Sequence, residues 1–175
     1  MPRPRKQKEK INYKIRHIDR GEPSHNILKH WRIVRYWAKR RFDLTDADID
    51  MIIFLYDERF FSHHDYKTFE AVTSWEKNRF TRLKKEGWIN TWRKRTRYDH
   101  AIYELSYKGK KLVTRIYAIL NGEEDFPEST RRNPVMKRQK YTDKVYSIWM
   151  TEINKINRER RFRQTLAQQS PTYRQ

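Results

Sequence analysis

The segment from Thr73 to Gly109 constrains the fold most strongly, because a helical pattern in it gives way directly to two strand patterns. The tetrapeptide Thr73-Ser74-Trp75-Glu76 has the form of a capping box, in which a threonine and a glutamate three residues later satisfy free N–H groups at a helix start. Apolar residues follow at helical spacing, and Gly87 stands where a glycine commonly ends a helix. The pattern predicts a helix from Ser74 to Glu86.

The residues after this helix predict a β-hairpin with a positively charged tip. Trp88–Trp92 and Ala101–Leu105 carry strand-forming residues, and Arg93–Arg97 between them holds four positive charges in five residues. Ser106 can then cap a helix that begins near Tyr107. A short helix followed by such a hairpin suits a duplex, because a helix fits the major groove and a hairpin tip reaches the backbone or the minor groove.

Two runs in this segment resemble the winged helix-turn-helix of MarR-type transcription regulators. Leu83-Lys84-Lys85-Glu86-Gly87-Trp88-Ile89 is similar to the end of the family's recognition helix, and Tyr103-Glu104-Leu105-Ser106-Tyr107-Lys108-Gly109-Lys110-Lys111-Leu112 is similar to the end of its wing. The resemblance extends from about Leu44 to Pro127. It implies a protein that binds double-stranded DNA without catalysis, and a homodimer built from the first and last helices, Ile27–Arg41 and Thr142–Arg163.

The other patterns predict a mainly α chain with a small β-hairpin (α+β), a winged helix-turn-helix with flanking N- and C-terminal helices. Thr45 and Ser62 are expected to cap two further helices, the second with help from Asp65 and ending before Thr73. A helix is also expected from Tyr107 to Asn121. The predicted organisation is a basic N-terminal arm (1–25), a winged helix-turn-helix domain (26–127), a basic linker (128–141), a C-terminal helix for dimerisation or packing (142–163) and a polar tail (164–175).

The charge of the chain points to a polyanionic partner. Lys and Arg number 41 against 22 Asp and Glu, which gives a formal net charge of +19. An aromatic content of 14% argues for an ordered centre, and the lack of cysteine excludes disulfides and thiolate metal sites. The longest apolar run, Met51–Tyr56, is far short of the ~20 residues of a membrane span. We therefore expect no membrane association and a location in the cytoplasm, of a bacterium or an infected host cell, or in a virion.

The candidate DNA contacts lie on the Ser74–Glu86 helix and on the hairpin tip. Asn78 and Arg82 are the predicted base readers, because both side chains can make bidentate contacts to base edges. The lysines beside them and the cations of the tip are expected to contact phosphates or the minor groove. An ordinary solvated basic helix is the alternative interpretation. The predicted DNA-binding residues are Lys77, Asn78, Thr81, Arg82, Lys85, Arg93, Lys94, Arg95 and Arg97.

No pattern in the chain indicates an enzyme, a cofactor or a metal site. His63-His64-Asp65 offers potential ligands, but adjacent residues of a helix point in different directions. Asp46, Asp48 and Asp50 lack the glycine and the final glutamate of a calcium loop. With only 4 glycines, the chain has little material for a nucleotide-binding loop.

Two other functions remain open from the sequence. One is a structural role, in which a phage or nucleoprotein component uses a winged-helix scaffold to bind protein and, without sequence choice, nucleic acid. The other is an RNA- or single-strand-binding module, which would require exposed aromatic residues such as Trp31, Trp37 and Trp149. Such tryptophans are more often core or interface residues. An apolar stripe on Thr142–Arg163 needs a cover, either a second subunit or the chain's own core.

Overall fold

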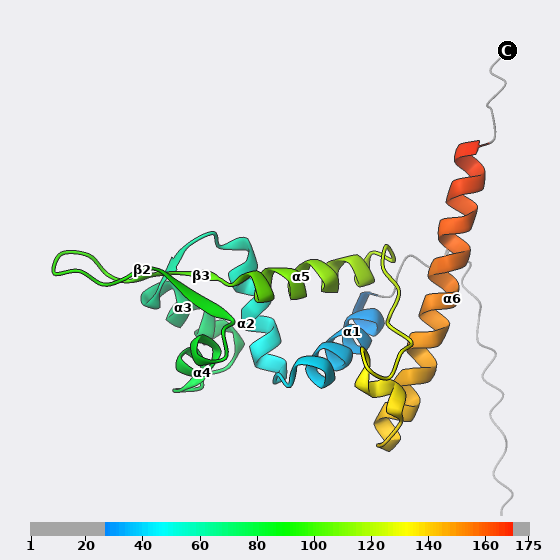
Figure 1. Ribbon diagram of the computed structural model, residues 1–175, viewed down its shortest axis with the longest axis horizontal. Coiled ribbons are helices and arrows are strands. Elements are labelled where there is room, and N and C mark those ends of the chain that lie inside the picture. The colour runs from blue at the N-terminus through cyan, green and yellow to red at the C-terminus, as the bar shows by residue number, and fades with distance from the viewer. Residues whose placement is uncertain (1–26, 170–175) are drawn as a thin grey trace, which may run out of the picture.

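The computed structural model describes residues 27–169 and confirms a mainly helical α+β chain with a small antiparallel sheet (Figure 1). The N-terminal arm (1–25) and the end of the polar tail (170–175) lie outside the described residues. In chain order the elements are α1 (Ile27–Phe42), α2 (Asp46–Asp57), β1 (Phe61–Ser62), α3 (His63–Thr73), α4 (Arg79–Lys85), β2 (Ile89–Arg93), β3 (Ile102–Leu105), α5 (Tyr107–Leu120), the 3₁₀ helix η1 (Pro134–Lys137) and α6 (Tyr141–Gln169).

Three helix starts lie where the sequence predicts them. The hydroxyl of Thr45 accepts from the backbone N–H of Asp48, and the Asp48 carboxylate accepts from the N–H of Thr45, which completes a capping box. Ser62 and Asp65 form the same arrangement at the start of α3. Ser106 caps α5 by accepting from the N–H of Gly109. The three predicted caps are therefore confirmed. They could be predicted because each cap depends only on residues within one turn of the chain.

The predicted capping box at Thr73–Glu76 is wrong, and the helix predicted from Ser74 begins only at Arg79. Thr73 is the last residue of α3, and its hydroxyl donates back to the carbonyl of Glu70 at 3.4 Å. Glu76 directs its carboxylate to Arg79 and Arg82, at 3.3 and 3.2 Å. Because this carboxylate pairs with arginines further along the chain, it does not close a box at Thr73, and α4 is only 7 residues long.

The end of α4 follows the prediction. Gly87 has a φ of +75°, and the N–H of Trp88 donates to the carbonyl of Leu83 at 2.8 Å, which is the Schellman arrangement. Trp88 is thereby turned inward and is 1% exposed.

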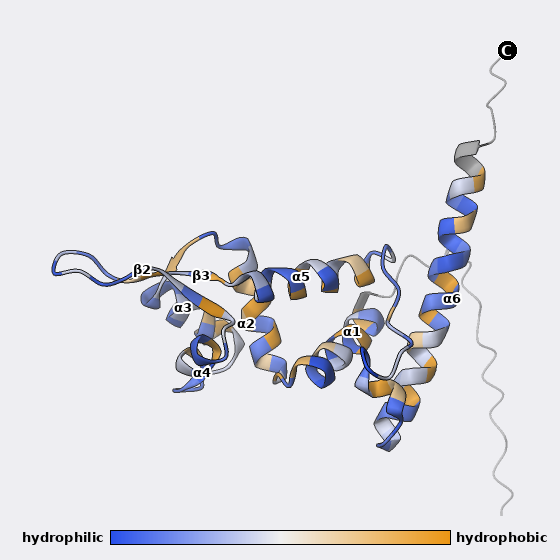
Figure 2. Ribbon diagram, in the orientation of Figure 1, coloured by the Kyte–Doolittle hydropathy of each residue, from blue (hydrophilic) through white to orange (hydrophobic). Residues whose placement is uncertain are grey.

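The predicted hairpin is present and gains a third strand. The strands are ordered β1-β3-β2, all antiparallel, with Phe61 opposite Tyr103 and Ile89 opposite Leu105. The sequence did not predict β1, since a strand of 2 residues carries no periodicity. The tip of the hairpin extends away from the helices (Figure 1) and is hydrophilic (Figure 2).

The core lies between α1, α2 and α5. Trp37 is fully buried and meets the rings of Phe42 and Phe126 edge to face, at centroid distances of 6.1 and 6.4 Å. Ile49 and Ile52 of α2 are also fully buried. Trp37, which the sequence left open as a base-stacking or a core residue, thus belongs to the core.

The last helix is longer than predicted and is held by polar contacts. α6 runs to Gln169 instead of ending at Arg163, and its C-terminal part extends beyond the other helices (Figure 1). The amide of the buried Asn154 bonds both the N–H and the carbonyl of Phe126, at 2.8 and 2.9 Å. Arg158 and Arg161 each lie 2.7 Å from the carboxylate of Asp125. The acidic loop after α5 therefore neutralises arginines of α6.

The segment predicted as a basic linker, 128–141, contains η1. Val135 of η1 and the preceding Asn133 are fully buried, and η1 packs on both α1 and α6. Within residues 27–169, no helix combines the length and the apolar character needed to cross a bilayer.

Candidate nucleic-acid interface

The outer face of α4 carries most of the polar residues that the sequence analysis assigned to DNA. Lys77, Asn78, Thr81 and Lys85 are all exposed. Asn78 occupies the N-cap position, but its side chain makes no capping hydrogen bond, so the amide is free to meet another partner. An open depression of about 560 Å³ runs along this face, lined by Asn78, Thr81, Arg82, Lys85 and Glu86.

Arg82 differs from these residues, because carboxylates of its own chain hold its guanidinium. Its two terminal nitrogens donate to the two oxygens of Asp48 at 2.9 and 2.8 Å, and Glu76 lies 3.2 Å away. The hydrogen bond with Asp48 raises the pKa of Arg82 above its ordinary value. With both terminal nitrogens engaged, Arg82 anchors α4 to α2. This geometry conflicts with the base-reading role predicted for it.

A second arginine, which the sequence analysis did not single out, completes this anchor. Arg79 is 2% exposed and lies 3.3 Å from Asp48, 3.4 Å from Glu70 and 3.3 Å from Glu76. Its guanidinium also donates to the carbonyl of Ser74. The two arginines and three carboxylates together tie α4 to α2 and α3. We call these five residues the arginine anchor: Asp48, Glu70, Glu76, Arg79 and Arg82.

The hairpin tip presents the predicted cations to solvent. Arg93 pairs with Asp99 across the hairpin at 3.6 Å. The N–H of Thr96 donates to the carbonyl of Asp99, and the N–H of Asp99 donates to the hydroxyl of Thr96, both at 3.0 Å, which closes the tip. The other three cations, Lys94, Arg95 and Arg97, form no ion pair with another residue in the described part of the chain.

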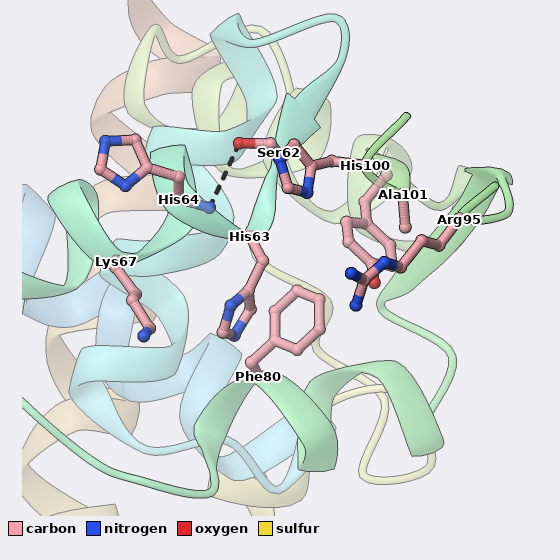
Figure 3. A pocket seen from close by; sticks show the side chains of 9 residues that line it. Ser62, His63, His64, Lys67, Phe80, Arg95, His100 and Ala101 are labelled. Carbon is pink, nitrogen blue, oxygen red and sulfur yellow. Dashed lines mark hydrogen bonds between the residues drawn. The ribbon is translucent and has the colours of Figure 1, made fainter. Parts of the chain in front are cut away.

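A pocket of about 530 Å³ lies between α3, α4 and the hairpin (Figure 3). We call it the cationic pocket; its lining residues are Ser62, His63, His64, Lys67, Phe80, Arg95, His100, Ala101 and Tyr103. The imidazole of His63 meets the ring of Phe80 edge to face at 4.8 Å, and Arg95 reaches the pocket from the hairpin. Because Phe80 belongs to α4 and Arg95 to the tip, the pocket joins the two parts of the predicted DNA-binding surface.

Sequence reasoning did not find the cationic pocket. It considered His63 and His64 only as metal ligands, and among residues 27–169 no group of three or more His, Asp or Glu side chains could hold a metal ion. The available signal was one lysine on α3, Lys67, and the cluster of cations at the hairpin tip. The pairing of β1 with β3 brings them together.

The two helices predicted to form a dimer pack against each other within one chain. Tyr36 of α1 stacks on Tyr146 of α6 at 4.2 Å and donates a hydrogen bond of 2.7 Å to Asp143. Met150 and Ile153 of α6 are buried. The chain's own core thus covers one side of the predicted stripe. The other side remains exposed, at Ile148, Trp149, Ile156, Phe162 and Leu166.

Comparison with known proteins identifies no relative. No family model matches the sequence, and no curated protein and no solved structure is significantly similar to the chain.

Proposed function

We propose that the protein is a winged helix-turn-helix DNA-binding protein that acts like a MarR-type regulator. In this proposal α4 enters the major groove, and the hairpin tip follows the backbone or enters the minor groove. The supporting order of elements is β1, α3, α4, β2, β3, with a connection of five residues between the two helices.

The observation that carries the proposal is the separation of charge around α4. Three carboxylates close to this helix, those of the arginine anchor, are engaged by Arg79 and Arg82. The exposed Glu86, which follows α4 and lines the outer depression, accepts from the indole N–H of Trp88 at 3.2 Å. Lys77 and Lys85 remain exposed on the outer face, and Lys94, Arg95 and Arg97 remain exposed on the tip. Positive charge that is not neutralised within the chain attracts phosphate, and its effect falls as salt increases.

The residues have different roles in this proposal. Asn78 reads a base edge, since its amide is exposed and can pair bidentately with adenine. The cations of α4 and of the tip bind phosphates and set the register of the helix. Arg82 acts as a positioning residue that fixes the angle of α4 against α2. This differs from the prediction made from the sequence.

A homodimer belongs to the same proposal. The ammonium of Lys29 covers the ring of Trp149, 3.5 Å from its centroid, but Ile148, Ile156 and Phe162 remain exposed on α6. A second copy of α6 would cover them and would place two α4 helices on the half-sites of a two-fold operator. Action in the cytoplasm of a bacterium or of an infected cell follows from such a role.

The exposed side of α6 also favours a second candidate function. A protein other than a second copy could cover Ile148, Ile156 and Phe162, which would make the chain a structural component of a nucleoprotein or virion. In that case the cations bind nucleic acid of any sequence.

The test combines selection with salt titration. The purified protein is incubated with a random duplex pool, and the enriched site is then titrated at several salt concentrations. We expect one two-fold motif. Asn78→Ala should relax selection at one base pair and lower the free energy of binding to the selected site by about 1–3 kcal/mol. Lys85→Ala should lower the slope of log K against log salt concentration by about 1. Lys137→Ala, an exposed substitution on η1 and outside α4, the hairpin and α6, is the matched control and should change neither.

Binding to duplex, single strand and RNA alike, with no motif enriched, would refute the regulator and support the structural role. Light scattering on the same sample measures the oligomeric state. Ile156→Glu should dissociate a dimer without unfolding the chain, because this side chain is 45% exposed.

A further inference from the structure

The cationic pocket has the size and composition of a binding site that duplex reading by α4 does not use. Its volume of about 530 Å³ lies within the range of small-molecule sites. It opens beside α4, on the side of Phe80, whereas Asn78, Thr81 and Lys85 line a separate depression.

One wall of the pocket is aromatic. The ring of Phe80 meets Tyr103 at 4.9 Å and His63 at 4.8 Å, both edge to face, and Tyr66 packs on it at 4.9 Å. These contacts fix the ring of Phe80 in a defined orientation. A fixed aromatic wall is the surface on which an unpaired base stacks, and a base within an intact duplex cannot reach such a wall.

The rim of the pocket carries two positive charges, Lys67 on α3 and Arg95 on the hairpin. His64 and His100 line the pocket as well, and Figure 3 shows the imidazole of His100 and the guanidinium of Arg95 on the hairpin side, across from Lys67. None of the nine lining residues is acidic. The nearby Asp65 carboxylate is engaged by the backbone N–H of Ser62 at 2.7 Å, and this hydrogen bond lowers the pKa of Asp65. The rim therefore suits a phosphate, next to a wall that suits a base.

We propose that the cationic pocket binds an unpaired nucleotide, with the base stacked on the exposed imidazole of His63, beside the ring of Phe80, and the phosphate held by the cations of the rim, Lys67 and Arg95. This inference rests on the proposed function, because the nucleotide belongs to a DNA strand that α4 and the hairpin hold in place. It adds a preference for strand ends, bulges or flipped bases to the recognition of the duplex.

The experiment compares three labelled DNAs of one sequence by fluorescence anisotropy: a blunt duplex, the same duplex with a short single-stranded overhang, and the single strand. The wild-type chain should bind the overhang duplex about tenfold more tightly than the blunt one, the ratio that one stacked base provides. The double variant His63→Ala, Lys67→Ala should bind both duplexes equally, with blunt-duplex affinity within about twofold of wild type. Both side chains are exposed, so the variant should fold.

Lys85→Ala is the matched control, since Lys85 lies on the outer face of α4 and outside the pocket. Lys85→Ala should weaken the binding of both duplexes by the same factor, so that the tenfold ratio of overhang to blunt-duplex affinity is unchanged. Free dAMP, added as a competitor, distinguishes a strand nucleotide from a soluble one. It should displace the overhang only at millimolar concentration.

The outcomes separate the two proposals. Equal affinity of the wild-type chain for blunt and overhang duplexes would overturn the nucleotide site and leave duplex binding standing. If neither duplex bound in a salt-dependent way, the proposed function would be overturned. The nucleotide site would then still be supported if the wild-type chain bound the single strand and the double variant His63→Ala, Lys67→Ala did not. If the wild-type chain did not bind the single strand either, the nucleotide site would be overturned as well. Displacement by micromolar dAMP would overturn the assignment to a nucleic-acid strand.

Discussion

Replacing Asp48 by asparagine tests whether the arginine anchor holds α4 in place. Asp48 is fully buried on α2, and its two oxygens accept from Arg82 at 2.9 and 2.8 Å. One of them also lies 3.3 Å from the buried Arg79. An asparagine of nearly the same size keeps the volume of the side chain but removes its charge and one of its acceptors.

The expected loss of stability can be worked out from these contacts. Breaking a buried ion pair from one side costs about 3–5 kcal/mol, because the remaining charge stays buried without its partner. Arg79 retains Glu70 and Glu76, and the side chain of Arg82 is 31% exposed, so water can reach it. Both facts place the loss at the lower end of that range, about 3 kcal/mol.

The assay is equilibrium unfolding in urea, followed by circular dichroism. Asp46→Asn is the matched control: Asp46 lies two residues earlier on the same helix and pairs with Arg35 and Lys39, but its side chain is 47% exposed. Its loss should cost no more than about 1 kcal/mol. If Asp48→Asn and Asp46→Asn lowered the free energy of unfolding equally, the argument that buried charges fix α4 would be refuted.

Three further predictions concern stability. Burial raises the pKa of Asp48, but hydrogen bonds from Arg82 and Thr45 outweigh it and hold the pKa below its ordinary value. The carboxylate therefore contributes its full stabilisation above the unfolded-state pKa of about 4, so the difference in melting temperature between wild type and Asp48→Asn should be constant from pH 7 to about pH 5 and should narrow as the pH falls below about 4. The hydroxyl of Tyr66 is buried and has no hydrogen-bond partner among the described residues, so Tyr66→Phe should leave the urea midpoint unchanged or raise it, and a loss above about 1 kcal/mol would reveal a missed partner. Gly87 and Gly122 have φ angles of +75° and +78°, but an added Cβ would meet open space at Gly87 and the side chain of Asn157, at 3.0 Å, at Gly122. Gly87→Ala should therefore lower the free energy of unfolding by about 1–2 kcal/mol, and Gly122→Ala should lower it measurably more. Equal losses would contradict the crowding at Asn157.

The sequence predicted those parts of the fold that depend on neighbouring residues. The caps at Thr45, Ser62 and Ser106 were correct because donor and acceptor lie within three residues of each other. The end of α4 at Gly87 was also correct, because its hydrogen bonds join residues only three and five positions apart. The start of α4 was not, because the local motif at Thr73 competes with Arg79 and Arg82 for the carboxylate of Glu76.

The candidate interface was predictable only in part, because its groups come from distant segments. Asp48 stands 34 positions before Arg82, and no local pattern announces that these two residues meet. The cationic pocket combines the start of α3 with the far strand of the hairpin, which the two-residue strand β1 brings together. The exposed cations of the tip were predictable from charge and turn position alone. Their contact with DNA stays a prediction.

The arginine anchor has a consequence for the way α4 moves. A helix of 7 residues is too short to persist in water without support, so α4 depends on the ion pairs of Arg79 and Arg82 and on the packing of the fully buried Leu83. Because Asp48 also completes the capping box of α2 with Thr45, the first turn of α2 and the whole of α4 share one carboxylate. Amide protons in both segments should therefore exchange with solvent in a single opening event. Under the proposed function, α4 would therefore meet the duplex as an ordered helix, with little loss of chain entropy at this surface.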